Sequence, residues 1–177
     1  MRTLAIAIAI ATVAASCSYS AGRTSDATLE EIRSRPGPTL YFVGEQFEEL
    51  PLTAIIDRGS RVTFVYGDCE IPFGTDGGCA PPLEVQVWPI ERRPPGAISD
   101  MLSCRLVTVR GAVGAFYGSD LDLYVGDLTV VVFADSRQRA LRAAAALRPV
   151  TAASAAAGPL PAPTIKPRPR LAHCETP

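Results

Sequence analysis

The sequence predicts an α+β domain: an antiparallel sheet of about six to eight strands, arranged as a meander, packed by one C-terminal amphipathic helix. Three observations predict it. Runs rich in β-branched and aromatic residues succeed one another from residue 106 to residue 134. Glycine-containing turns separate these runs, and an alanine- and arginine-rich segment with helical periodicity follows them directly. A short N-terminal helix is expected in addition.

The first elements of the domain carry a helix start signal and a hairpin signal. Thr28 and Glu31 have the T-x-x-E spacing of a capping box, and Pro36 ends the helix that begins there, near Leu29 to Ser34. Strands are then expected at residues 39–43, 52–56 and 61–66, with the turn at residues 57–60 joining the last two as a hairpin.

The segment Leu83 to Trp88 alternates between apolar and polar side chains. Such alternation is typical of a strand with one buried and one solvated face, which puts Glu84, Gln86 and Trp88 on the solvated side. The meander strands are expected at residues 106–110, 114–117, 121–125 and 129–134, with turns at Gly111, residues 118–120 and residues 126–127.

A helix is predicted from about Ser136 to Leu147. On a helical wheel the apolar residues Ala140, Leu141, Ala144 and Leu147 share one side, and arginines share the other. Asp135 or Ser136 provides an N-cap, and Arg148 stands near the C-terminal end, where the helix dipole favours a cation. The helix is therefore expected to lie on the sheet.

The N-terminus has the layout of a secretory signal in residues 1–16. A basic Met1-Arg2 precedes an uncharged, largely apolar run from Thr3 to Ala15, which is too short to span a bilayer as a helix. Small residues directly before Cys17 resemble the lipobox of bacterial lipoproteins, with Ala14 where Leu is usual. That resemblance implies lipidation of Cys17, anchoring at the outer face of the cell membrane, and a tether at residues 17–27. The alternatives are plain secretion after cleavage near Ser16, and an uncleaved anchor.

Two further cysteines enclose a glycine-rich polar loop. In an exported chain a disulfide between Cys69 and Cys79 explains such a loop best, because few of its residues can pack. A calcium loop is not expected, since the acids Asp68, Glu70 and Asp76 lack the regular spacing of calcium ligands.

A loop braced in this way is also a candidate surface for a binding partner. The residues that we single out for partner binding are Asp68, Glu70 and Trp88.

The C-terminal residues 151–177 are rich in proline and alanine and are expected to be a largely disordered tail beyond a single domain at residues 28–150. Four cysteines remain after lipidation, so three pairings are possible. We favour Cys104 with Cys174 as the second bridge, the alternative being a free Cys174. A metal site at residues 173–175 is not expected, because neighbouring side chains rarely converge on one ion.

No catalytic residue, metal or cofactor is predicted. The single histidine, His173, lies in the tail, and no phosphate loop or dinucleotide fingerprint is present. A net charge of -1 predicts no nucleic-acid partner. The acids that could form a carboxylate pair are ascribed to solvation and turn geometry: Glu48, Glu49, Asp120, Asp122 and Asp127.

From TLYFVG and CAPPLEVQVW to LYVGDLTVVVFA and ALRAAAALRPV, residues 29–150 resemble an uncharacterised group of exported actinobacterial proteins without an assigned activity. More distantly, the pattern is similar to extracytoplasmic sensor domains of anti-sigma regulators and to lipoprotein-carrier folds, a likeness of fold only.

Three classes of function follow. The first is an anchored, non-catalytic lipoprotein that binds an envelope protein or a small ligand. The second is a sensor or ligand carrier, which needs an apolar cavity between sheet and helix. The third is a carboxylate-based hydrolase, which needs two acids in a cleft.

Overall fold

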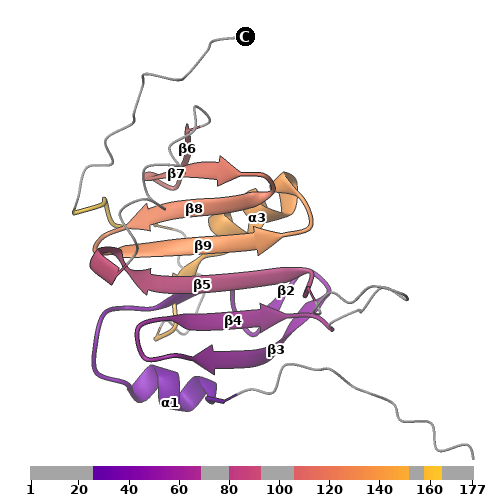
Figure 1. Cartoon of the computed structure of the whole chain (residues 1–177), viewed down its shortest axis with the longest axis vertical. Helices are drawn as coiled ribbons and strands as arrows, with labels where there is room; N and C mark the ends of the chain where they lie inside the picture. The colour runs from indigo at the N-terminus through magenta and orange to yellow at the C-terminus, as the bar shows by residue number, and fades with distance from the viewer. Residues whose placement is uncertain (1–25, 69–79, 93–105, 152–157, 165–177) are drawn as a thin grey trace, which may run out of the picture.

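The computed structural model describes residues 26–68, 80–92, 106–151 and 158–164. Within these residues the main body is an eight-stranded antiparallel sheet with helix α3 behind it in Figure 1. The strand order is β2-β3-β4-β5-β9-β8-β7-β6, and β1 and β10 form a separate two-stranded sheet. The predicted α+β class, an antiparallel meander with a C-terminal helix, is confirmed.

The N-terminal half forms, in order, α1 (Leu29–Ser34), β1 (Tyr41–Phe42), β2 (Gln46–Phe47), β3 (Leu50–Asp57), β4 (Val62–Tyr66) and β5 (Leu83–Pro89). The C-terminal half forms a 3-10 turn, η1 (Ile90–Arg92), then β6 (Leu106–Val109), β7 (Ala112–Tyr117), β8 (Asp120–Val125), β9 (Leu128–Ala134), α3 (Arg137–Ala146) and β10 (Arg148–Pro149). The capping box of α1 is present, with Thr28 as N-cap and Glu31 at its third position.

The strand predictions from residue 50 onward agree with the structure, but the strand expected at residues 39–43 is reduced to β1. This strand pairs only with β10, through Tyr41 opposite Pro149 and Phe42 opposite Arg148. Proline has no backbone N–H to donate, and beyond Pro149 the pairing continues as one hydrogen bond, from the N–H of Val150 to the carbonyl of Leu40 at 2.9 Å. The small second sheet was not predicted.

Pairing between β5 and β9 joins the two halves of the sheet. The two strands align antiparallel from Leu83 opposite Ala134 to Pro89 opposite Leu128. No local sequence pattern indicates this contact, because the partners are about forty to fifty residues apart in the chain. It places β4 and β5 beside the predicted meander in one continuous sheet (Figure 1).

Helix α3 is capped by Ser136, whose hydroxyl accepts a hydrogen bond from the backbone N–H of Arg139. Ala140, Ala143 and Ala144 are fully buried, whereas Leu141, expected on the buried side, is 37% exposed. Leu141 lies about 100° from Ala140 around the helix, so it falls at the edge of the buried stripe.

A different residue from the one expected neutralises the C-terminal end of α3. The guanidinium of Arg110 donates to the backbone carbonyls of Ala145, at 3.3 Å, and Leu147. Arg148 instead places its guanidinium 5.3 Å from the centre of the Phe42 ring. A residue from the β6–β7 turn therefore performs the role predicted for a neighbour in sequence.

The main core lies between the sheet and α3. Side chains that alternate along the central strands fill it, and they are at most 1% exposed: Leu83, Val85, Val87, Leu121, Leu123, Val130 and Val132. The opposite face of β5 was expected to be solvated, which is wrong for Glu84, because this side chain is 7% exposed. Both faces of the central strands are therefore largely buried.

Part of the predicted tail belongs to the domain. Leu160 is 5% exposed and lies in the main core, and its N–H donates to the carbonyl of Arg110 at 2.8 Å. Gly126 donates to the carbonyl of Pro161 at 3.2 Å and accepts from the N–H of Thr164 at 2.8 Å. The expected boundary at residue 151 is thus too early for residues 158–164, because an extended proline-rich segment can still pair its backbone with exposed turns.

The predicted tether, residues 17–27, also extends too far toward the domain. The N–H groups of Asp26 and Ala27 donate to the carbonyl of Ile55, at 3.0 and 3.3 Å, so these two residues are part of the domain. The other N-terminal and cysteine predictions fall outside the described residues: the signal at residues 1–16, Cys17, the Cys69–Cys79 and Cys104–Cys174 bridges, and Glu70.

Candidate functional site

The residues predicted to bind a partner do not form one compact site. Asp68 is exposed just after β4, at the edge of the sheet where β5 begins with Leu83. Trp88 is half-buried near the other end of β5. Five residue steps along a strand separate these two ends by roughly 17 Å. Trp88 and Asp68 therefore belong to different surroundings.

A cavity of about 200 Å³ lies at the Trp88 end of β5. Its walls come from the N-terminal segment (residues 26–40, which includes α1), the β3–β4 turn, and the sheet edge where β5 ends and β9 begins. The apolar lining consists of Ile32, Leu40, Val62, Val87, Leu128 and Val150. We call this space the arginine cavity, for the three arginines that complete its wall.

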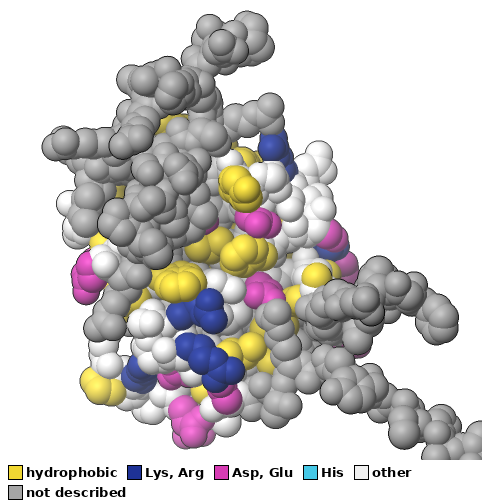
Figure 2. All heavy atoms as spheres, in the orientation of Figure 1, with side chains coloured by type: hydrophobic (Ala, Val, Ile, Leu, Met, Phe, Trp, Pro, Cys, Tyr) yellow, Lys and Arg dark blue, Asp and Glu magenta, His cyan; other side chains and the backbone are white. Residues whose placement is uncertain are grey.

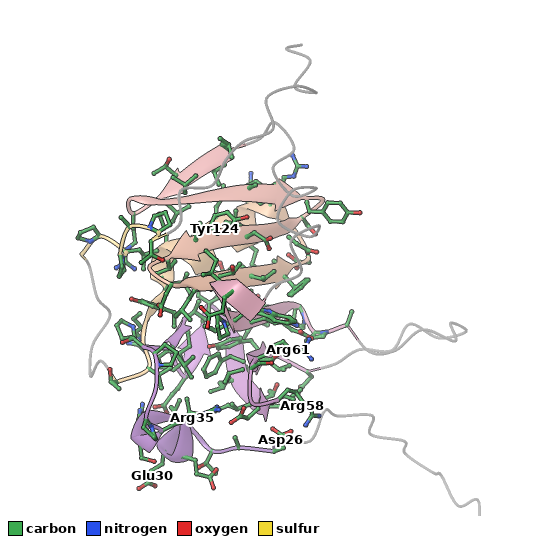
Figure 3. All side chains as sticks on the ribbon, turned by 60° about the vertical axis from the view of Figure 1, so that its left-hand side comes forward. Asp26, Glu30, Arg35, Arg58, Arg61 and Tyr124 are labelled. Carbon is green, nitrogen blue, oxygen red and sulfur yellow. The ribbon has the colours of Figure 1, made fainter. Side chains whose placement is uncertain are left out.

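Ionic contacts hold the N-terminal segment against the β3–β4 turn. The carboxylate of Asp26 pairs with Arg58 and accepts the backbone N–H of Asp57 at 2.6 Å. Arg35 donates to the carboxylate of Asp57 at 2.6 Å. Figure 3 shows Arg58 and Asp26 side by side, with Arg35 beside α1. The outer wall of the cavity is thus fastened on both sides of α1.

The three arginines of the lining differ in how their charges are compensated. Arg33 pairs with Glu45 at 3.0 Å, and Arg35 pairs with Asp57. Arg61 has no ion pair among the described residues, and no aspartate or glutamate is part of the lining. Arg61 thus differs from the other two arginines, and its guanidinium lies over Trp88, which is not part of the lining.

Arg61 is stacked on the predicted Trp88. Its guanidinium carbon lies 4.9 Å from the centre of the indole ring, a cation–π arrangement. The Nε atom of Arg61 is buried and meets no hydrogen-bond acceptor in the described part of the chain, and the same holds for Nε1 of Trp88. Leaving a buried donor unpaired costs about 1–3 kcal/mol. The stacked pair lies on the sheet face that also carries Thr63 and Thr129, opposite the face on which Val62 and Val87 line the cavity.

The sheet face opposite α3 is unusual because it buries polar side chains. The four polar or charged residues that are buried in the described part all lie on it: Thr63, Glu84, Asp122 and Thr129. They stand on four neighbouring strands, since β4, β5, β9 and β8 are adjacent. Figure 2 views this face and shows basic and acidic side chains among hydrophobic ones over its lower strands.

The acids considered for catalysis are dispersed. Glu48 and Glu49 form ion pairs with Arg139 of α3, and Glu48 also accepts from Arg142 at 2.6 Å. The hydrogen bond from Arg142 is the main cause that lowers the pKa of Glu48. These two glutamates tie the β2–β3 turn to α3, which is a structural role.

The aspartates of the meander occupy three environments. Asp120 begins β8, where burial raises its pKa, and Asp127 is exposed in the β8–β9 turn. Asp122 was ascribed to a turn, which is wrong, because it lies inside β8 and is 2% exposed.

Sequence reasoning found Trp88 but missed the arginines beside it. Arg61 directly precedes β4, and alternation puts it on the same face as Thr63. The alternation of β4 could therefore have placed Arg61 on this face from the sequence alone. The register that brings β4 beside β5, with Val62 opposite Val87, was needed to place Arg61 next to Trp88.

Comparison of the sequence with protein-family models gave no match, and searches among curated proteins and among solved structures gave none either. Among the described residues, no helix has the length and hydropathy needed to cross a bilayer. The same residues bring together no group of three or more metal-ligating side chains.

Proposed function

We propose that this protein is an exported lipoprotein, anchored through Cys17 at the outer face of the cell membrane, whose domain binds a ligand without catalysing a reaction. The arginine cavity is the single structural observation that carries the binding role. It combines apolar walls with a few polar residues in its lining, among them Arg33 and Arg35, which is the composition of small-molecule sites in proteins. An envelope protein as partner is the other form of this proposal, for which the exposed Asp68 beside the Cys69–Cys79 loop is the candidate surface.

The anchor is supported by the layout of residues 1–17. A short apolar run that ends in Ala14-Ala15-Ser16-Cys17 suits export followed by acylation of the cysteine sulfur. Stable attachment then needs two acyl chains, because a single chain is only marginally retained by a bilayer.

Mass spectrometry of the mature protein from its host membrane tests the anchor. We expect an N-terminal peptide that begins at Cys17 and carries a diacylglycerol, and we expect Cys17→Ala to release the protein from the membrane fraction. Ala14→Leu is the matched control, since it brings the segment closer to the usual lipobox and is expected to raise the acylated fraction. An unmodified Cys17 in membrane-bound protein contradicts the anchor.

Binding is tested separately, by saturable shifts in the thermal midpoint with small apolar compounds. The larger residue in Val62→Ile narrows the arginine cavity and is expected to weaken any compound that occupies it. If no compound binds saturably while a crosslinked envelope protein is recovered reproducibly through Asp68, the protein-partner form of the proposal replaces the ligand form.

A further inference from the structure

The lining of the arginine cavity limits both the charge and the size of a ligand. We propose that the cavity binds a compact uncharged molecule, which has an apolar body and one hydroxyl or carbonyl group. This ligand class rests on the binding function proposed above and is independent of the anchor at Cys17. Molecules of the same shape that carry a net charge of either sign are expected to bind poorly.

The volume of the cavity sets the size of the ligand. A cavity of about 150 Å³ lined by apolar side chains accommodates benzene. The arginine cavity, at about 200 Å³, has room for one ring with a short substituent. A long acyl chain does not fit in this volume.

The inner part of the cavity is apolar. Its floor belongs to the main core, and the floor residues are at most 5% exposed: Ile32, Val62, Val87, Leu128 and Val150. Leu40 and Pro89 are half-buried members of the lining and add apolar surface above this floor. A ligand body placed here removes that surface from water, which favours a hydrocarbon.

Two arginines of the lining already have counter-charges. Arg33 donates to the carboxylate of Glu45 at 3.0 Å. Arg35 donates to the carboxylate of Asp57 at 2.6 Å and to the backbone carbonyl of Gly59 at 3.1 Å. At least a third of each arginine side chain is exposed, so these two ion pairs lie at the opening of the cavity and not in its floor.

The third arginine directs its charge elsewhere. The guanidinium of Arg61 lies over the ring of Trp88, 4.9 Å from the ring centre. Alternation puts both residues on the sheet face that carries Thr63, opposite the face of Val62 and Val87. Aspartate and glutamate are also missing from the described residues of the lining. Neither an anion nor a cation therefore meets an uncompensated opposite charge in the cavity.

The absence of an available counter-charge selects against ions. A charged group that enters the cavity loses part of its hydration, and an existing ion pair has to break before the group gains a partner. A hydroxyl or carbonyl group can instead stay at the opening, in water and among the exposed polar residues of the lining, Thr39 and Thr151. An uncharged ligand thus buries its apolar body without burying a charge.

Three probes of nearly the same shape test the proposal: benzyl alcohol, benzoate and benzylamine, which is a cation at neutral pH. The protein is the complete mature chain with Cys17→Ser, which removes the acylation site, and NMR shifts of valine and leucine methyl groups report binding. We expect benzyl alcohol to bind with a Kd of about 1 mM or below, at least about tenfold more tightly than either ion. Its saturable shifts should be largest at Val62 and Val87. If either ion binds as tightly as benzyl alcohol, the uncharged ligand class is overturned while ligand binding stands.

Removing one counter-charge should change the selectivity. Glu45→Gln leaves Arg33 without its carboxylate partner and keeps the shape of the side chain. We expect benzoate to gain about threefold in affinity and benzyl alcohol to stay unchanged. Glu30→Gln is the matched control, because Glu30 is exposed on α1 and is not part of the cavity lining. A benzoate affinity that does not change in Glu45→Gln, or that rises equally in Glu30→Gln, contradicts the proposal.

Two valines of β4 localise the binding. Val62→Ile narrows the cavity and is expected to weaken benzyl alcohol at least about threefold. Val65→Ile enlarges a buried side chain on the opposite face of the same strand and should leave the affinity unchanged. Equal losses in the two variants contradict the proposal, and if Val62→Ile does not fold, the shifted methyl groups of the chain with native Val62 locate the site. Absence of saturable shifts with all three probes overturns the cavity as a ligand site, and with it the ligand form of the proposed function.

Discussion

The two α-helices of the described part of the chain rest on the sheet in different ways. Helix α3 presents three alanines and is followed by Leu147, all of them fully buried. Helix α1 is shorter and buries a single residue, Ile32, beside a linker that contains Pro36 and Pro38. The arginine cavity lies next to α1.

This difference shows how helix packing decides where a space remains beside the sheet. Alanine side chains let the backbone of α3 approach the sheet closely, so the region beneath it is filled. One branched side chain and a stiff proline linker cannot follow the sheet surface in the same way, and a space remains beside them. The arginine cavity therefore lies beside the weakly packed helix.

The largest expected effect is the loss of a large core side chain. Leu147→Ala should lower the free energy of unfolding by about 3–4 kcal/mol, because a cavity remains in well-packed surroundings. Ile32→Ala should cost less, about 2 kcal/mol, because the structure beside α1 can relax around the new space. Chemical denaturation of both variants measures this, and an equal or larger loss at Ile32 contradicts the contrast between the helices.

Enlarging a buried side chain should have opposite effects in the two regions. Ala144→Leu must displace either α3 or the sheet, and we expect it to cost about 2 kcal/mol. Val62→Ile adds one methylene into the arginine cavity and should be neutral or stabilising by up to about 1 kcal/mol. If Val62→Ile proves as damaging as Ala144→Leu, the cavity is not available space.

Removing the N-cap side chain should lower the stability of the whole domain at α3, but should only promote local unfolding at α1. Ser136→Ala should lower the free energy of unfolding by about 1 kcal/mol, since α3 is integrated into the core. Thr28→Ala removes the capping box of α1, and we expect its main effect to be faster amide exchange within residues 29–34. Hydrogen exchange measured on both variants checks this, and exchange that rises throughout the sheet in Thr28→Ala would count against local unfolding of α1.

The smallest expected effect is on the pH dependence of stability. Hydrogen bonds from Arg142 and Arg139 hold the pKa of Glu48 below its ordinary value of 4.5. A lowered pKa in the folded state means that the stabilisation is present above pH 4.5 and is lost as the pH falls through the folded pKa. Hydrogen bonds from Thr28 lower the pKa of Glu31 in the same sense.

Denaturation midpoints at about pH 6 and about pH 3.5 measure this effect. Glu48→Gln should reduce the difference between the two midpoints, because the titrating group at the β2–β3 turn is gone. Glu30→Gln is the matched control, as Glu30 is exposed on α1. A difference that persists unchanged in Glu48→Gln would show that this glutamate is not coupled to folding.

The elements set by short-range rules were predicted well. The T-x-x-E spacing located α1 and its cap at Thr28, and the glycine turns located the hairpins from β6 to β9. Leu141 shows the limit of such rules, because a wheel gives the direction of a side chain but not the width of the surface that covers it. The tail shows the same limit, since its composition did not indicate that Leu160 packs into the core.

The candidate site was predicted only in part. Trp88 was singled out, whereas Arg61 was not, because the two meet across a strand pair whose register depends on the whole sheet. Asp68 and Trp88 were grouped since they flank one segment of sequence, yet a strand holds its two ends apart.

Local sequence patterns were enough for the long strands of the main sheet, their turns, the cap of α1 and the class of fold, because alternation, glycine positions and capping act between residues a few positions apart. Three features depend on the folded sheet as a whole: β5 pairs with β9, Arg110 caps the C-terminal end of α3, and Arg61 stacks on Trp88. These contacts join residues from about 25 to 50 positions apart, and their free energy arises from packing that the complete sheet makes possible.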